Sequence, residues 1–450
     1  MKLRAPAAVP AGRRSRGAVA VALASFAIVA FPACERTRVT ADEAEPAESP
    51  EPAGRWHKLH EARARASLTP EQLEMIEKLE AIGYASGSIQ SHTRGVTVHD
   101  RDRVQAGLNF YTSGHGPEAV LIDMDGNELH RWRYAIDEVW PDHPRKRRHR
   151  AQWWRRATLF DNGDVLAIFA GFGIIKVDKD SNLIWAHRTG AHHDLEIMPD
   201  GDIYVLTRTP HVVPRVNPAK PILEDFISVL GADGVEKRRV SLLEAFENSG
   251  YAHLWHDARR RSGDIFHTNG LSVLDGRIAD RLPAFRRGNV LISVHTFDTI
   301  AVVDLDAVRV AWALQGDYRG QHDPKTLENG NLLLFDNYGT EEQSSVIELD
   351  PASTRTVWQY RGTPERPFYS FTCGTADRLA NGNTVIIESD FGRAFEVTPD
   401  REIVWEYYNP HRAGERDEFI ATLFDLKRLP PDFPSDWVRR TTGGQRSSPR

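Results

Sequence analysis

The chain has 450 residues, with 57 Lys and Arg against 63 Asp and Glu and a formal net charge of -6 at pH 7. This near balance gives no reason to expect nucleic acid or a membrane surface as the main partner. The composition is that of a soluble globular protein, with 11 Trp as its one excess. Length alone would suggest two or three domains, although repeats can build one large domain.

The N-terminus has the pattern of an export signal. Basic residues precede an apolar run over residues 18–33 that is short for a membrane span, so residues 1–34 are interpreted as a signal peptide. Cys34 follows Ala33 as at a bacterial lipoprotein cleavage site, whereas the two residues before Ala33 fit that pattern poorly. We therefore expect an exported protein, either periplasmic or membrane-anchored as a lipoprotein through a lipidated Cys34. Cys373 then has no intrachain partner.

Two segments follow the signal before the repetitive part of the chain begins. Residues 35–68 are rich in Glu, Ala, Pro and Arg, which predicts a flexible tether. Residues 69–106 are expected to hold a short helix and a linker. Thr69 can cap the helix, Pro70 suits its first turn, and apolar residues recur at helical spacing until Gly83.

From about residue 107 onward, short apolar strands alternate with turns that contain Asn-Gly or Asp-Gly pairs. Such pairs suit tight hairpins, because both residues tolerate positive φ. Four of these turns contain Gly163, Gly201, Gly330 and Gly382. The last strand of a unit carries a Trp, which we expect to pack between neighbouring blades. These residues are Trp132, Trp185, Trp312, Trp358 and Trp405. A recurrence of roughly 40 to 50 residues with four strands per unit is typical of a β-propeller.

Counting the units predicts six blades. Five inner strands are expected to begin near residues 155, 193, 267, 322 and 374. The sixth blade is split, because residues 421–430 repeat the inner-strand pattern and residues 107–134 supply only outer strands. Joining the two closes the ring and removes exposed strand edges. The predicted fold class is therefore all-β, a six-bladed propeller over residues 107–430 closed by its N- and C-terminal strands. A polar, frayed tail is expected at residues 431–450.

Three histidines occupy equivalent positions in different blades. His193 and His322 each lie eight residues before the turn glycine of their repeat, and His267 begins the inner strand between them. The inner strands of a propeller all run the same way along the channel, so equivalent positions form one ring at one mouth. We therefore expect the three imidazoles to meet there.

The neighbours of these histidines have less certain roles. We expect His192 to face away from the channel. Asp194 and Asp323 either orient the adjacent histidines or bond to the backbone.

Three segments of the chain resemble the bacterial arylsulfotransferases. They are residues 192–207, residues 266–269, and the run from Gln321-His322-Asp323 to Asn337, which is the most distinctive. The resemblance extends over roughly residues 107–430. It implies a six-bladed propeller that moves a sulfuryl group from a phenolic sulfate ester to another phenol through a transient sulfohistidine. It also implies a reaction without a nucleotide donor (PAPS-independent) and without a cofactor.

The resemblance carries individual residues over by motif. His322 matches the nucleophile, and His193 and His267 match the supporting histidines. Asn269 matches a residue that contacts the sulfate. Thr372 matches a polar contact near the start of the fifth blade.

The chain departs from the family at one position. The family has an arginine in the strand after the His267 element, where this chain has His295. An arginine offers a permanent charge and forked donors, whereas a histidine is only partly charged near neutral pH. His295 either replaces the arginine in binding the substrate or is a plain strand residue. Arg155 and Arg208 are possible sources of the missing charge, with a surface or inter-blade role as the alternative.

Two other functions stay open at this stage. Three convergent histidines can hold a divalent metal for hydrolase or lyase chemistry. The loss of the arginine favours a non-catalytic binding propeller. The sequence leaves open the donor, the acceptor and the oligomeric state.

Overall fold

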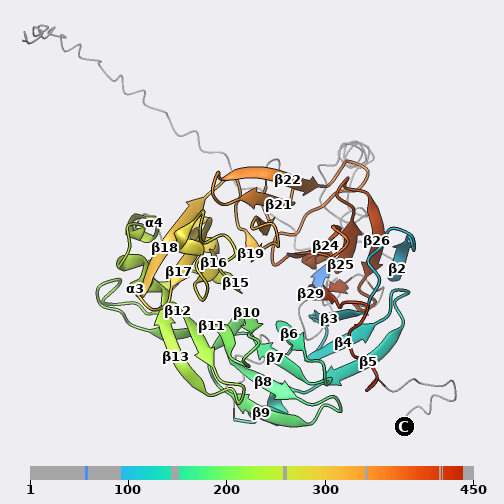
Figure 1. The fold of residues 1–450 in the computed structure, drawn as a ribbon. Coiled ribbons are helices and arrows are strands. Elements are labelled where there is room, and N and C mark those ends of the chain that lie inside the picture. Colours follow the sequence, from blue (N-terminus) through green and yellow to red (C-terminus); the bar gives the residue numbers. More distant parts are fainter. Residues whose placement is uncertain are drawn as a thin grey trace, which may run out of the picture. The chain divides into compact units, whose positions relative to one another are not determined.

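Antiparallel sheets repeat six times around a central channel in the computed structural model (Figure 1). The structure describes residues 56–58, 93–142, 152–256, 261–339, 343–414, 417 and 419–438. All of these belong to one compact unit, Pro50–Arg450. The predicted signal peptide, Cys34 and the helix expected from Thr69 lie outside the described residues, so export and lipidation stay predictions.

Each blade runs from an inner strand at the channel to an outer strand at the rim. Blade 1 consists of β6 (Arg156–Leu159), β7 (Val165–Phe169), β8 (Gly173–Val177) and β9 (Leu183–His187). Blade 2 consists of β10 (Ala191–Ile197), β11 (Ile203–His211), β12 (Ile222–Leu230) and β13 (Glu236–Ser241), with β14 (Gly263–Asp264) parallel to β12. Blade 3 consists of β15 (Thr268–Val273), β16 (Val290–Val294), β17 (Thr299–Asp304) and β18 (Arg309–Gln315).

The remaining blades follow the same order. Blade 4 consists of β19 (His322–Thr326), β20 (Leu332–Asp336), β21 (Ser345–Asp350) and β22 (Arg355–Arg361). Blade 5 consists of β23 (Thr375–Arg378), β24 (Thr384–Glu388), β25 (Arg393–Val397), β26 (Ile403–Tyr408) and, as a fifth strand, β2 (Gly95–His99). Blade 6 consists of β29 (Leu423–Arg428), β3 (Asn109–Ser113), β4 (Glu118–Ile122) and β5 (Glu128–Arg133).

Blade 6 confirms the predicted closure of the ring. Its inner strand β29 comes from the C-terminal part of the chain and pairs antiparallel with β3, from Leu423 opposite Ser113 to Arg428 opposite Asn109. Every inner strand therefore has a neighbour on its outer side. Backbone hydrogen bonds between β29 and β3 thus join the last strand of the propeller to one of its first. This junction, the seam of the ring, has no open strand edge.

The arrangement of the blades determines which strands are buried. Because a blade packs between two others, both faces of its middle strands are covered. All five residues of β7, β16, β20 and β24 are buried accordingly. Their sequences are nearly continuous apolar runs, such as Leu332–Phe335, and not alternating patterns.

Tryptophans of four outer strands bond to the neighbouring blade, as predicted. The indole nitrogen of Trp132 in blade 6 donates to the carbonyl of Gly163 in blade 1, at 2.9 Å. Trp405 in blade 5 donates to Met124 in blade 6, at 2.9 Å. Trp358 makes the equivalent bond from blade 4 to blade 5. A buried N–H needs such an acceptor, so these residues fix the blade-to-blade distance.

The structure differs from the sequence prediction at both ends of the propeller. Residues 56–58 of the expected tether form β1 (Trp56–Lys58), which pairs with β28 (Phe419–Ala421). In the expected linker, β2 pairs with β26 and covers the outer edge of blade 5. In the expected frayed tail, the indole of Trp437 donates to the carbonyl of Asp161, at 3.0 Å, and its ring packs on Trp132.

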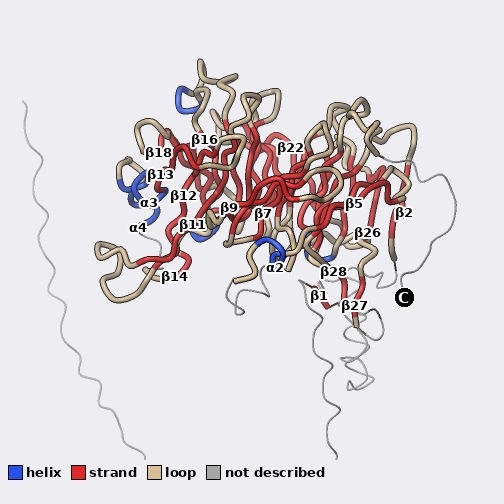
Figure 2. Tube along the Cα trace, turned by 90° about the horizontal axis from the view of Figure 1, so that it is seen from below, coloured by secondary structure: helices blue, strands red, loops and turns tan. Residues whose placement is uncertain are grey.

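Several short elements of the described residues lie outside the six four-stranded blades. With β27 (Arg412–Ala413), strands β1 and β28 form a small sheet on one side of the propeller (Figure 2). The helical segments are α2 (Ile136–Val139), α3 (Leu242–Glu247), α4 (Ala252–His256), η3 (Pro283–Phe285), η4 (His295–Phe297) and η5 (Ser389–Phe391). Within the described ranges, no helix has the length and hydropathy to cross a membrane.

Candidate active site

Four histidine rings form an arc where the inner strands begin. The ring centroids of His193 and His267 are 4.9 Å apart, and those of His267 and His295 are 5.2 Å apart. The arc continues from His295 to His322 at 5.6 Å. The structure therefore brings together the three histidines predicted from the repeats and places His295 between two of them. His295 lies in η4 just beyond β16, not within the strand.

Irregular backbone at the start of the inner strands aims these side chains. His193, His267 and Asp323 have positive φ values of 52°, 50° and 52°. In each of the three blades the pairing register shifts at this point, as in a β-bulge. A bulge re-aims a side chain out of the strand's alternation, and left-handed backbone in a non-glycine residue costs free energy. The same irregularity thus recurs at the start of the inner strand in three blades.

The hydrogen bonds of His322 fix its tautomer. Its Nδ1 lies 2.9 Å from the carbonyl oxygen of Gly320 and 2.7 Å from Oδ1 of Asn337. The amide nitrogen of Asn337 donates to the carbonyls of Ser370 and Cys373, so its Oδ1 must face the histidine as an acceptor. Both partners of Nδ1 are acceptors, so Nδ1 carries the hydrogen. Nε2 therefore carries the lone pair.

The surroundings of His322 keep the ring neutral. Burial lowers the pKa of His322 well below its ordinary value of 6.5, and the nearby charges of His295 and Arg155 lower it further. Burial likewise lowers the pKa of His193, with His267 as the next cause. A neutral imidazole with a free lone pair is a nucleophile, whereas an imidazolium is not.

A carboxylate orients His267. Oδ2 of Asp264 lies 2.8 Å from Nδ1 of His267, and Oδ1 accepts the backbone N–H of His267 at 3.0 Å. Burial raises the pKa of Asp264, but the hydrogen bond from His267 and the charges of His267 and Arg208 hold it at about 2. The carboxylate accepts from Nδ1 and so fixes the orientation of the ring, an arrangement found in general acid–base catalysis.

His192, which we expected to face away from the channel, contacts both His193 and a carboxylate of its own blade. The residue is buried, its Nδ1 lies 2.8 Å from Nδ1 of His193, and its Nε2 lies 3.6 Å from Oδ1 of Asp225 on β12.

Asn269 and Thr372 are held by protein groups near the mouth. The amide of Asn269 donates to the carbonyl of Gln321, at 2.9 Å, and so supports the residue before His322. The hydroxyl of Thr372 donates to Asp390, at 2.6 Å. Direct contact of either residue with a sulfate stays a prediction.

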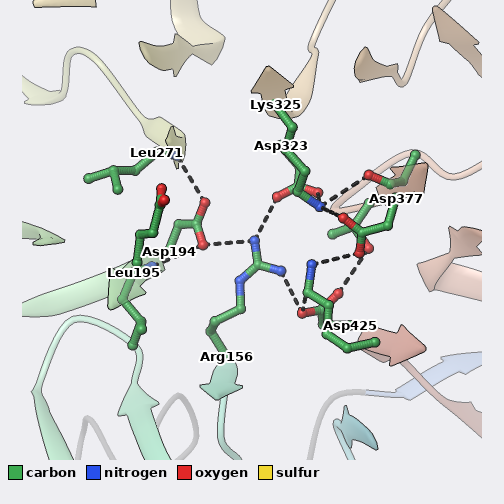
Figure 3. A network of polar contacts seen from close by, with 12 residues as sticks. Arg156, Asp194, Leu195, Leu271, Asp323, Lys325, Asp377 and Asp425 are labelled. Carbon is green, nitrogen blue, oxygen red and sulfur yellow. Dashed lines mark hydrogen bonds and ion pairs between the residues drawn. The ribbon is translucent and has the colours of Figure 1, made fainter. Parts of the chain in front are cut away.

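Directly after the mouth, one arginine crosses the channel (Figure 3). Nη2 of Arg156 lies 2.8 Å from Asp194 and 2.7 Å from Asp323, and Nη1 lies 2.7 Å from Asp425. Asp194 also accepts the backbone N–H of Leu271, at 2.9 Å. The two aspartates beside the histidines therefore bind Arg156, with backbone N–H groups as further partners of Asp194 and Lys325 as a further partner of Asp323. Arg156 and its partners join blades 1, 2, 4 and 6.

A second polar layer lies farther along the inner strands. Lys325 contacts Asp323 at 2.6 Å and also pairs with Asp377, which lies 2.7 Å from Lys427. A cavity of about 390 Å³ is lined by these strands, including Arg156, Lys325 and Lys427. Asp194 and Asp323 of the first charged layer line this cavity as well, whereas none of the four histidines does.

The spacing of possible ligand atoms among the described residues bears on the metal-site alternative. The three predicted histidines do not bring ligand atoms mutually within 4.8 Å, whereas His115, Glu118 and His411 do. Burial and the charges of Arg131 and a neighbouring arginine lower the pKa of His115 to about 3. Arg131 also pairs with Glu118. This group lies in blade 6 and the loop before β28, outside the histidine arc.

An aromatic pair beside the arc was missed by sequence reasoning. The rings of Tyr338 and Phe371 lie 5.3 Å apart, and Tyr338 lies 6.1 Å from His295. Phe371 is 57% exposed, which is unusual for a phenylalanine. Tyr338 follows Asn337 directly, and Phe371 precedes Thr372, so both stand on loops that the site already uses.

The fold and the site together define a class of protein. It is a six-bladed β-propeller in which histidines from several blades meet at one mouth of the channel. The sequence profile of the family described as arylsulfotransferase (ASST) matches residues 156–410, more than half of the chain, and the protein belongs to this family. No curated protein gives a significant match.

The solved structures that match this chain share little sequence with it. A protein of unknown function from Bacteroides caccae is 12% identical, with 72% of this chain and 98% of that chain covered and a TM-score of 0.46. A streptogramin B lyase is 13% identical, with 75% and 94% covered and a TM-score of 0.40. The virginiamycin B lyase from Staphylococcus aureus is 12% identical, with 57% and 69% covered and a TM-score of 0.34.

Proposed function

We propose that the protein transfers a sulfuryl group from a phenolic sulfate ester to a phenol through a covalent intermediate on Nε2 of His322. The observation that carries this proposal is the fixed tautomer of His322. Gly320 and Asn337 hold the hydrogen on Nδ1, and burial keeps the ring neutral. Family membership supports the reaction class.

The reaction divides into two balanced steps. Nε2 of His322 attacks sulfur, the bond from sulfur to the phenolic oxygen breaks, and the phenolate leaves with the electron pair and takes a proton. In the second step the oxygen of the acceptor phenol attacks the same sulfur, loses its proton, and the N–S bond breaks. His267, held by Asp264, is the group that gives the proton in the first step and takes it in the second.

The aryl ring of each substrate is assigned to the Tyr338–Phe371 pair, because it adjoins His295 and is exposed. Phe371→Ala is expected to raise KM for nitrophenyl sulfate about fivefold and to change kcat much less, since one aromatic contact contributes roughly 1 kcal/mol. Steady-state kinetics measures both constants. Leu183→Ala, an exposed apolar position on blade 1, is the matched control and should change neither constant. If Phe371→Ala changed kcat and left KM unaltered, a role of the Tyr338–Phe371 pair in substrate binding would be excluded.

The pH profile tests the neutral nucleophile. Protonation of His322 stops its attack, and its pKa is lowered, so activity should persist as pH falls below 6.5. We expect the acid limb of kcat/KM with nitrophenyl sulfate to lie well under that value. An acid limb at or above 6.5 would contradict a buried neutral nucleophile.

The direct test is to trap the intermediate. The protein is incubated with nitrophenyl sulfate without an acceptor, digested under neutral or basic conditions, and analysed by mass spectrometry. One sulfuryl group on the peptide that contains His322, discharged when a phenol is added, is expected. Nitrophenol release without any labelled histidine would contradict the covalent route, and no release would contradict transferase activity with this donor.

A further inference from the structure

A buried carboxylate lies behind the histidine arc, and no step of the proposed reaction uses it. Asp225 on β12 is 1% exposed, and its Oδ2 accepts the backbone N–H of Thr268, at 2.8 Å. Its Oδ1 is buried without a hydrogen-bond partner, and so is Nε2 of His192. These two atoms lie 3.6 Å apart. Unpaired buried polar atoms are costly, so a hydrogen shared between the two would stabilise both.

His192 connects this carboxylate to the arc. Its other ring nitrogen, Nδ1, lies 2.8 Å from Nδ1 of His193, and the planes of the two rings stand at 89° to each other. His193 has left-handed backbone, and its ring adjoins that of His267. Asp225, His192 and His193 therefore form a chain of polar contacts that leads from the interior of blade 2 to the arc.

The contact between the two Nδ1 atoms can hold only one hydrogen. Burial lowers the pKa of His192 and of His193 well below 6.5, so both rings are neutral. A neutral imidazole carries a hydrogen on one nitrogen and a lone pair on the other. If Nδ1 of His192 donates, His193 keeps its hydrogen on Nε2. If Nδ1 of His193 donates, its Nε2 has a lone pair instead.

The protonation of Asp225 decides between these two arrangements. An ionised carboxylate only accepts, so it requires the hydrogen of His192 on Nε2 and leaves a lone pair on Nδ1. His193 then donates from Nδ1, and its Nε2 is an acceptor. A protonated carboxyl group donates to Nε2 of His192 instead, which moves the hydrogen of each ring to its opposite nitrogen. Nε2 of His193 is then a donor.

We infer that Asp225, acting through His192, sets the tautomer of His193 in the candidate active site. Asp225 is a positioning residue, because it acts on the reaction only through two other side chains. Its effect on catalysis rests on the proposed function. An N–H on Nε2 of His193 can stabilise negative charge that develops on the substrate, whereas a lone pair there repels it. The tautomer itself can be measured without turnover.

The surroundings place the change of tautomer near neutral pH. Burial raises the pKa of Asp225 to about 7, and the charge of Asp264 contributes to the rise. Asp225 is therefore neutral at pH 6 and ionised at pH 8.5, so the donor form of His193 is lost as the pH rises. The other groups that act on Asp225 or His192 are Thr207 and Arg208 on β11, Asp264 on β14, His267, and Thr268 on β15.

Asp225→Asn tests the inference, because an amide donates to Nε2 of His192 as the protonated acid does and cannot ionise. Nitrogen-15 NMR of histidine-labelled protein should show the hydrogen of His193 on Nε2 at pH 6 and on Nδ1 at pH 8.5. In Asp225→Asn it should stay on Nε2 at both values. Asp233→Asn, at an exposed turn of the same blade, is the control and should behave as the unaltered protein does.

The rate of sulfurylation should follow the tautomer. In single-turnover experiments with nitrophenyl sulfate, the unaltered protein should lose about 30-fold in the rate of labelling of His322 between pH 6 and pH 8.5, as a group of pKa about 7 ionises. Asp225→Asn should lose much less. Thermal unfolding verifies that each variant is folded.

Each outcome decides a different claim. If the tautomer of His193 is the same at both pH values in the unaltered protein, or changes equally in Asp225→Asn, the inference is wrong and the proposed function is unaffected. If the rate falls as steeply in Asp225→Asn as in the unaltered protein, Asp225 has no effect on catalysis. If the tautomer behaves as expected but His322 is never sulfurylated, the proposed function fails and the role of Asp225 stands. Should Asp225→Asn not fold, carbon-13 NMR of the unaltered protein decides, because the carboxyl group of Asp225 and the tautomer of His193 must change at the same pH.

Discussion

Replacing His322 with asparagine is expected to abolish sulfuryl transfer and leave the propeller folded. An asparagine amide nitrogen is not nucleophilic, but its N–H can still donate to Asn337 and Gly320, so the local structure should survive. Loss of the attacking group should lower kcat by a factor on the order of 10⁴ to 10⁶. Release of nitrophenol in the presence of a phenol measures the activity, and circular dichroism with thermal unfolding verifies the fold.

The control for this variant is another histidine. His253→Asn changes an exposed residue of α4 and should keep full activity. Turnover retained in His322→Asn would exclude His322 as the nucleophile. Loss of both activity and folded structure would instead show that the ring has a structural role, because Asn337 and its partners in blade 5 depend on it.

Replacing Arg156 with leucine is expected to give the largest loss of stability. The arginine bonds three buried aspartates from three other blades, and its removal leaves these carboxylates without their cation. Breaking a buried ion pair by removing one partner costs about 3–5 kcal/mol. We expect at least that loss in the free energy of unfolding, measured by chemical denaturation followed by circular dichroism, and a reduced yield of folded protein.

An exposed ion pair provides the comparison. Arg101 pairs with Asp125 at 2.7 Å and is largely exposed, so Arg101→Leu should change the free energy of unfolding by less than about 1 kcal/mol. Similar losses in Arg101→Leu and Arg156→Leu would contradict the special role of the buried network. Restored stability in Arg156→Lys would show that charge alone, without the forked geometry, suffices to hold the blades.

Much of the fold follows from features that are local and repeated. Turn glycines such as Gly201 and Gly330 mark the hairpins, and the tryptophans mark the outer strands, so the blades and the closure by β29 were predictable. The additional strands were not. Whether residues 95–99 form a strand depends on the free edge of β26, which exists only after blade 5 has formed.

The site was predictable to the extent that it depends on register. Counting eight residues back from the turn glycines identified His193 and His322. The role of Asn337 was not predictable, because it depends on a tautomer set by contacts with Ser370 and Cys373 in the next blade. The sequence does show a carboxylate, Asp264, three residues before His267. Only the structure shows that the two side chains are in contact.

The seam between β29 and β3 also bears on when the site can form. A chain synthesised only as far as residue 422 already contains all four histidines, yet it lacks the strand that completes the ring. The final pairing joins segments separated by almost the entire domain, and contacts of such high sequence separation form slowly. The histidine mouth should therefore mature late, after the ribosome has released the chain, and partially made or truncated molecules should lack activity even though every catalytic side chain is present.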